Sequence, residues 1–134
     1  MSKSNYVCNQ GDTGGTGICA SPNEMTKFRD VTDGLSNTLL VGEKHIPRGH
    51  MRDYPWDCSI FDGHQWVCHT RAAGPDFPIA TDRNADVWSF GSEHPGICQF
   101  LYGDGSVRAV KSHINPVTLG LLANRQDGQV IGEY

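Results

Sequence analysis

The chain has 134 residues, 37% of them hydrophobic and 19% charged, and a formal net charge of −4 at neutral pH. A chain of this length can bury a core of its own, so we expect a single domain over residues 1–134. Its sparse, mildly acidic charge does not favour a nucleic-acid partner or an anionic membrane surface, because both are bound through clustered Lys and Arg. Sixteen glycines and seven prolines predict many turns and long connections.

Loop and strand signals alternate in the first third of the chain. Residues 9–22 are rich in Gly and Thr without periodicity and predict an irregular loop, and the short apolar pattern at 28–33 ends at a turn. Residues 38–42 (TLLVG) predict a strand that is buried on both faces or packed under a loop. Glu43 follows directly and is expected to be drawn inward, where a carboxylate needs a partner; Arg108 is the candidate.

Residues 45–86 form a loop-rich insertion dominated by Gly and Pro turn signals. One short strand is predicted at 64–69, with Trp66 and Cys68 on one face. The basic stretch at 44–52 is interrupted by Pro and Gly and predicts a solvated loop. A connection this long is usually functional or faces a partner.

The segment that follows predicts a strand and then a hairpin. Trp88 and Phe90 alternate with small residues, as in a half-buried strand. Residues 97–102 and 106–110 predict the two arms of a β-hairpin around Gly-Asp-Gly at 103–105, because glycines supply the positive φ angles of a tight turn.

A short helix is expected near the end of the chain. Asn115 and Pro116 are a helix-start signal, with the Asn as cap and the Pro at the first helical position. Residues 118–125 then make about two turns, and residues 130–131 predict a short terminal strand. The elements together predict an α+β fold: a small antiparallel β-sheet with long loops and a short C-terminal helix.

The five cysteines bear on the cellular compartment. Cys8 with Cys19, and Cys58 with Cys68, would each close a loop of about ten residues, which stabilises by roughly 2–3 kcal/mol. Cys98 is left over in an apolar run, where a buried free thiol is expected. Pairing cannot be read from sequence, so oxidised and reduced states both stay open.

Several side chains are candidates for chemistry. His94 and Asp104 could form a catalytic or metal-binding pair, with Ser92 nearby, but the Gly-x-Ser-x-Gly signature of a hydrolase is missing. The structural alternative is a loop histidine and a turn aspartate bonded to the local backbone, and it is favoured. The loop aromatics Trp56, Phe61 and Trp66 are candidates for a glycan or other surface ligand.

Metal binding is a further, less favoured possibility. Imidazole and thiolate are the ligands that zinc prefers, although their spacing here matches no structural zinc motif; the candidates are His45, His50, His64, His69 and Cys68. Carboxylates could hold calcium without an EF-hand pattern; the candidates are Asp12, Asp30, Asp33, Asp82 and Asp86.

Three motifs resemble those of a known family. They are DVTDGLSNTLLVGEK at 30–44, FGSEHPGICQFLYGDGSVRAV at 90–110, and LGLLANRQDGQVIGEY at 119–134. They are similar to the planctomycete-type group of prepilin-like proteins of unassigned function. The matching motif residues are Asp33, Gly34, Ser36, Asn37, Thr38, Glu43, His94, Pro95, Gly96, Asp104 and Gly105. Ile97 departs from the pattern, because the family usually has a second glycine there.

The resemblance implies a pilin-like globular domain outside the cytoplasmic membrane, in a pseudopilin-like protein of the envelope or of type II secretion. It implies no catalytic residues and no cofactor. Its partners would be like subunits or other envelope proteins, and it would reach the membrane only through a prepilin helix that this chain lacks. The alternatives are a surface ligand-binding module for a glycan or metal ion and, less favoured, a hydrolase using His94 and Asp104.

Overall fold

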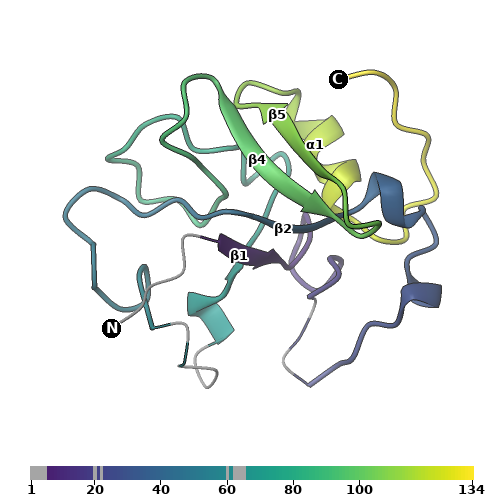
Figure 1. Cartoon of the computed structure of the whole chain (residues 1–134), viewed down its shortest axis with the longest axis horizontal. Helices are drawn as coiled ribbons and strands as arrows, with labels where there is room; N and C mark the ends of the chain where they lie inside the picture. Colours follow the sequence, from purple (N-terminus) through teal and green to yellow (C-terminus); the bar gives the residue numbers. More distant parts are fainter. Residues whose placement is uncertain (1–5, 20, 22, 60, 62–65) are drawn as a thin grey trace.

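The computed structural model describes residues 6–19, 21, 23–59, 61 and 66–134. In this part of the chain, five strands form one sheet in the order β3-β1-β2-β4-β5 (Figure 1). The strands are β1 Tyr6–Asn9, β2 Leu39–Glu43, β3 Thr70–Arg71, β4 Ile97–Tyr102 and β5 Val107–Lys111. One helix, α1, spans Pro116–Ala123, and three short 3-10 turns cover Phe28–Asp30, Leu35–Asn37 and Trp66–Cys68. The small α+β fold is therefore as predicted.

The sheet is mixed, which corrects the prediction of a purely antiparallel one. β3 pairs with β1 in parallel, whereas the other neighbours are antiparallel. A parallel pair needs a long crossover connection, and residues 10–69, which include β2, provide it. The sequence pattern did not show this pairing, because β3 is only two residues long.

Strand β1 lies where the sequence predicted no strand and the beginning of a loop. Asn9 is fully buried, and its amide nitrogen donates to the carbonyl oxygens of Leu39 and Ala123, at 2.8 Å each. Its amide oxygen accepts the backbone N–H of Gly11 at 2.9 Å. One asparagine therefore joins β1 to β2 and to the end of α1, and it ends the strand where the loop begins.

The predicted hairpin is confirmed and shifted by one residue in its second arm. β4 and β5 pair from Ile97 opposite Lys111 to Leu101 opposite Val107. Residues of β4 alternate between partly buried and buried, so Cys98, Phe100 and Tyr102 face the core. Gly105 has φ of +87°, the conformation for which glycine was predicted at this turn.

The core lies on one side of the sheet, between β2, β4, the 89–91 segment and α1. The rings of Phe90 and Phe100 meet edge to face with their centroids 5.1 Å apart. Gly42 lies against both rings: a Cβ there would stand 2.5 Å from Phe100 Cε1 and 2.6 Å from Phe90 Cδ1. The predicted strand is thus confirmed with a shift of one residue, to Leu39–Glu43, and glycine is needed where two aromatic rings approach its backbone.

The segment around Phe90 is not the half-buried strand that its alternation predicted. Ser89, Phe90 and Gly91 are all buried and make single β-bridges to three different segments, at residues 72, 44 and 80. The chain passes between other segments here, so both of its sides are covered. The alternation of large and small residues therefore gave a wrong prediction of one exposed face, because both faces of this stretch are covered by other parts of the chain.

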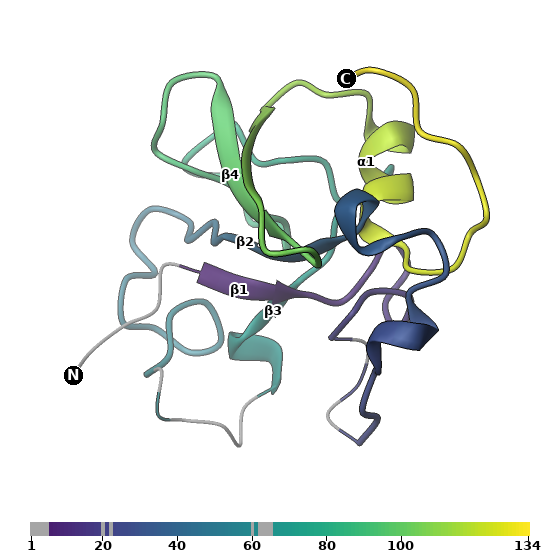
Figure 2. The same cartoon turned by 45° about the vertical axis from the view of Figure 1, so that its right-hand side comes forward.

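The helix prediction is confirmed at its start. The Asn115 side chain accepts the N–H of Val117 at 2.8 Å, and Pro116 is the first helical residue. The helix ends at Ala123 rather than at 125. The predicted strand at 130–131 is wrong: Val130 is 95% exposed, and the tail passes α1 without joining the sheet (Figures 1 and 2). Valine and isoleucine favour a strand only where a neighbouring strand can pair with them.

The predicted strand at 64–69 is also wrong over its described part, because Trp66–Cys68 form a 3-10 turn and the strand begins at Thr70. Residues 64 and 65 lie outside the described residues. Hydrogen bonds to the Trp66 carbonyl oxygen favour the turn. This oxygen accepts the N–H of His69 at 3.0 Å and the hydroxyl of Thr70 at 3.3 Å.

Candidate functional site

The His-Pro-Gly loop, residues 92–96, leads into β4 and brings two of the sequence motifs together. His94 is half-exposed, and its Nε2 lies 3.1 Å from Oε1 of Glu43, at the end of β2. The second oxygen of Glu43 accepts the backbone N–H of Gln99 at 2.7 Å. Glu43 is only 13% exposed. The carboxylate was correctly expected to need a partner, but the partners are His94 and a β4 amide.

Arg108, the predicted partner of Glu43, lies elsewhere. Its guanidinium stands 4.3 Å from the centroid of the Tyr102 ring and 3.5 Å from the carboxylate of Asp104. Arg108 lies on β5 opposite Phe100, whereas Glu43 follows Gly42 of β2 on the other side of β4 and accepts the Gln99 amide. Strand β4 therefore lies between Glu43 and Arg108.

His94 and Asp104 are separated by the length of β4, because one precedes this strand and the other follows it. Asp104 accepts the N–H and the hydroxyl of Ser106, at 2.9 and 2.7 Å, and these bonds hold the pKa of its carboxyl below the usual range. The Ser92 hydroxyl accepts the backbone N–H of His94 at 2.9 Å. The structure therefore does not assemble the nucleophile–base–orienter geometry that a serine hydrolase needs.

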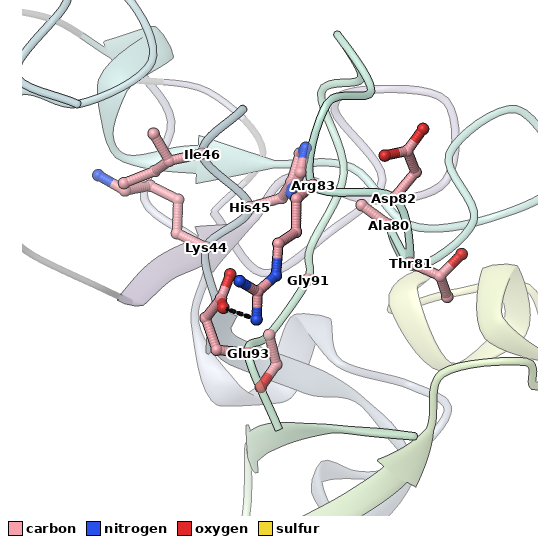
Figure 3. A pocket seen from close by; sticks show the side chains of 10 residues that line it. Lys44, His45, Ile46, Ala80, Thr81, Asp82, Arg83, Gly91 and Glu93 are labelled. Carbon is pink, nitrogen blue, oxygen red and sulfur yellow. Dashed lines mark ion pairs between the residues drawn. The ribbon is translucent and has the colours of Figure 1, made fainter. Parts of the chain in front are cut away.

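Hollows flank the His-Pro-Gly loop on both sides. One of about 430 Å³ lies between Ser92–His94 and the side chains of Glu43, Ile46 and Met51. Another, of about 220 Å³, lies between the same loop and residues 79–83. A smaller one joins them, and an Arg83–Glu93 ion pair crosses it (Figure 3). The loop is therefore a ridge with open space on either side.

A buried ion pair lies beside the ridge. Lys44 Nζ stands 3.5 Å from Asp57 Oδ1, and both side chains are only 1% exposed. Asp57 Oδ2 accepts the N–H of Arg52 at 2.8 Å, and Arg52 has φ of +67°, which side chains rarely adopt. Lys44 thus contradicts the prediction of a solvated basic stretch. Alternation along the strand did not indicate this burial, because Glu43 and Lys44 point to opposite sides and both side chains are largely buried.

Arg71 is a second buried cation that the sequence did not indicate. It is fully buried, and burial lowers its pKa to about 10, so it remains charged at neutral pH. Its guanidinium stands 3.9 Å from the Trp88 ring centroid. Its two terminal nitrogens donate to backbone carbonyls of His45, Trp56, Val67 and Thr70. Arg71 thereby fastens the 45–68 loops to β3.

The zinc candidates are dispersed. His45 Nε2 bonds to the carbonyl of Ala85 at 2.8 Å, and His50 Nδ1 to Asp53 at 2.9 Å. Cys68 forms a disulfide, and His64 lies outside the described residues. Among the described residues, no group of three or more His, Cys, Asp or Glu is placed to hold a metal ion.

The calcium candidates have separate, local roles. Asp12 accepts the hydroxyl of Thr16 at 2.6 Å, Asp30 the N–H of Lys27 at 2.8 Å, and Asp82 the N–H of Asn84 at 2.8 Å. Asp86 lies 3.8 Å from His50. Asp33 accepts the N–H groups of Asp127 and Gly128, at 2.7 and 2.9 Å, so it fastens the segment after α1. Asp33 therefore has a role beyond the predicted turn, because it also binds a segment far along the chain.

The ring contacts of the loop aromatics do not join Trp56, Phe61 and Trp66 into one binding surface. The Trp56 ring packs against the rings of Trp88 and His50, with centroids 5.0 and 5.8 Å apart. Phe61 is 82% exposed, and Trp66 is partly buried in its 3-10 turn. Binding of a glycan at these residues stays a prediction.

The cysteines form the two local pairs that their spacing suggested, and both pairs, whose oxidation state the sequence left open, are oxidised. Disulfides join Cys8 to Cys19 and Cys58 to Cys68, and Cys98 is a buried free thiol. Burial, with a smaller contribution from the Glu43 charge, raises the pKa of the Cys98 thiol to about 12. The thiol is therefore protonated and unreactive at neutral pH.

Fold and cysteines together define a small α+β domain with a mixed sheet and two local disulfides. Residues 2–117 match the family described as "Protein of unknown function (DUF1559)", and the chain belongs to that family. Comparison with curated proteins and with solved structures finds no match. Within the described residues, no helix has the length and apolar character needed to cross a membrane.

Proposed function

We propose that this chain is a pilin-like globular domain of a pseudopilin-like envelope protein. It works outside the cytoplasmic membrane as a non-enzymatic structural and interaction domain. One observation carries the proposal: the three motif carboxylates all bond to the fold itself. Asp33 holds the segment after α1, Glu43 holds His94 and β4, and Asp104 closes the hairpin turn. The motifs therefore maintain a scaffold, which suits a domain whose long loops are displayed.

The disulfides support the location. Disulfides persist in oxidising compartments and are rare where thiols are kept reduced. Two of them close short loops here, with sequence separations of 11 and 10 residues. A domain displayed at the cell surface or in the periplasm would need such local cross-links for its long irregular loops.

The 45–86 segment supports the interaction role. Three large apolar side chains on it, Met51, Tyr54 and Phe61, are well exposed to solvent. Exposed aromatic and methionine side chains are enriched at protein–protein interfaces. We propose that this segment meets like subunits or other envelope proteins.

The location is tested by trapping thiols in intact cells that produce the natural protein. After denaturation without reduction, we expect one alkylated cysteine, Cys98, and two intact disulfides by mass spectrometry. Five alkylated cysteines would place the protein in a reducing compartment and overturn the proposal.

The interaction role is tested by a photo-crosslinking amino acid at Tyr54, with Val117 on α1, also well exposed, as the matched control. Adducts at position 54 that contain a second copy or another envelope protein support the proposal. Equal adducts at both positions, or adducts with cytosolic proteins alone, contradict it.

A further inference from the structure

The hollow of about 430 Å³ beside His94 has two chemically different walls. Ile46 and Met51 line one wall, and Met51 is 67% exposed, so it is available to a ligand. Glu43 and His94 line the other wall, and Gly91 leaves the floor without a side chain. A volume of this size is within the range of small-ligand sites, which combine apolar walls with a few placed polar groups.

The polar wall is negative. Each oxygen of the Glu43 carboxylate has one contact, to His94 or to the Gln99 amide, and a carboxylate can accept about four hydrogen bonds. Glu93 adds a second carboxylate at the rim, where it is largely exposed. The hollow therefore offers carboxylate oxygens with remaining capacity next to an apolar surface.

The nearby cations of the chain are directed elsewhere. The Lys44 ammonium is buried on Asp57, and Figure 3 shows it pointing away from Glu93. Arg83 reaches Glu93 across the smaller hollow, whose lining does not include Glu43 or Met51. An incoming cation would thus meet Glu43 without displacing a buried ion pair.

We infer that this hollow binds a protonated primary amine on an alkyl stem, the group that a lysine side chain or a free alkylamine carries. The stem lies against Ile46 and Met51, and the ammonium donates to Glu43 with Glu93 at the rim. An anion would be repelled by both carboxylates, and a neutral apolar ligand would bury Glu43 without a new donor, which is costly. This inference goes beyond the proposed envelope role and does not depend on it.

The test is a titration of the ¹⁵N-labelled domain with n-pentylammonium, using n-pentanol as the neutral match. We expect saturable shifts of the Glu43, Gly91 and His94 amides with the amine, and binding at least about fivefold weaker with the alcohol, about 1 kcal/mol. A second arm compares Nα-acetyl-lysine N-methylamide with its norleucine analogue. Binding in either amine arm supports the site and identifies its source, whereas no binding in both arms overturns it.

Variants then locate the site. Glu43→Gln keeps an acceptor for the Gln99 amide and should weaken amine binding about tenfold, because the lost charge is mostly buried. Met51→Ser should weaken it about threefold, and Glu93→Gln by about twofold or less, because an exposed charge contributes little. Glu133→Gln, in the exposed tail, is the control and should change nothing. If Glu43→Gln does not fold, unchanged binding in Met51→Ser alone overturns the proposal.

Discussion

Two regions of this molecule are held together in different ways. The motif half, residues 30–43 and 90–128, contains the hairpin and helix, where key bonds join close neighbours, as Asp104 with Ser106 and Asn115 with Val117. The central segment, residues 45–86, depends on buried charges that reach across the chain. Arg71 donates to carbonyls 15 and 26 residues away, and Lys44 pairs with Asp57.

This difference indicates how strongly the stability of each region depends on a single side chain. Many small interactions stabilise the motif half, so each single substitution there should lower the free energy of unfolding by a moderate amount. A buried charge is stable only while its partners are in place, because desolvation costs several kcal/mol per ion. The central segment should therefore respond much more strongly to the loss of one group, and each prediction below tests that contrast.

Removal of one charge that holds the central segment should have the largest effect. Lys44→Met leaves Asp57 buried without its ammonium, and we expect a loss of about 3–5 kcal/mol in the free energy of unfolding, measured in urea. The double variant Lys44→Met/Asp57→Leu should regain part of this loss. A cost for Lys44→Met below about 1 kcal/mol would show that the pair contributes no more than a surface ion pair.

A core substitution in the motif half should cost less. Gly42→Ala places a methyl group 2.5–2.6 Å from the rings of Phe100 and Phe90, and both rings must shift. Overpacking of this kind costs about 1–3 kcal/mol, again measured in urea. Gly128→Ala is a useful comparison, because no heavy atom lies near its added methyl and only its φ of +70° opposes alanine. If the two variants cost the same, ring contact is not the cause.

A local cap should cost less again. Asn115→Ala removes the side chain that accepts the Val117 N–H, and we expect a loss of about 1 kcal/mol. Asn115→Ser keeps a capping oxygen and should restore most of it. Hydrogen exchange should show the change confined to α1, with β4 and β5 unaffected. A loss above about 3 kcal/mol would mean that the motif half is not built from small independent terms.

The contrast also explains what the sequence could predict. The hairpin and the helix start lie between residues close in the chain, so turn and capping residues indicate them directly. The two disulfides also join cysteines close in the chain, so the spacing suggested the pairs but not their oxidation. β1, the burial of Lys44 and the carbonyl cage of Arg71 depend on contacts made only after folding. The Glu43–His94 contact is intermediate: the motifs marked both residues, but only the pairing of β2 with β4 brings them together.

The smallest predicted effect concerns a carboxylate at the end of the motif half. One oxygen of Asp127 is buried without a hydrogen-bond partner, and burial, with smaller contributions from Asp33 and Asp12, raises the pKa of this carboxyl. The charged form therefore opposes folding above its raised pKa. Asp127→Asn keeps the acceptor for the Gln129 N–H and removes that charge. We expect a gain of about 0.3–0.5 kcal/mol at neutral pH, small because solvent screens a partly exposed group.

The pH dependence identifies the cause of this gain. Because the folded-state pKa is raised, wild-type stability from this group is complete below the unfolded carboxyl pKa and is lost as the pH rises through the folded value. The advantage of Asp127→Asn should therefore be full at neutral pH and shrink as the pH falls through the range where Asp127 becomes protonated. Urea unfolding of both proteins at a series of pH values measures it. An advantage independent of pH would mean that the new amide forms a hydrogen bond, and that removal of charge is not the source.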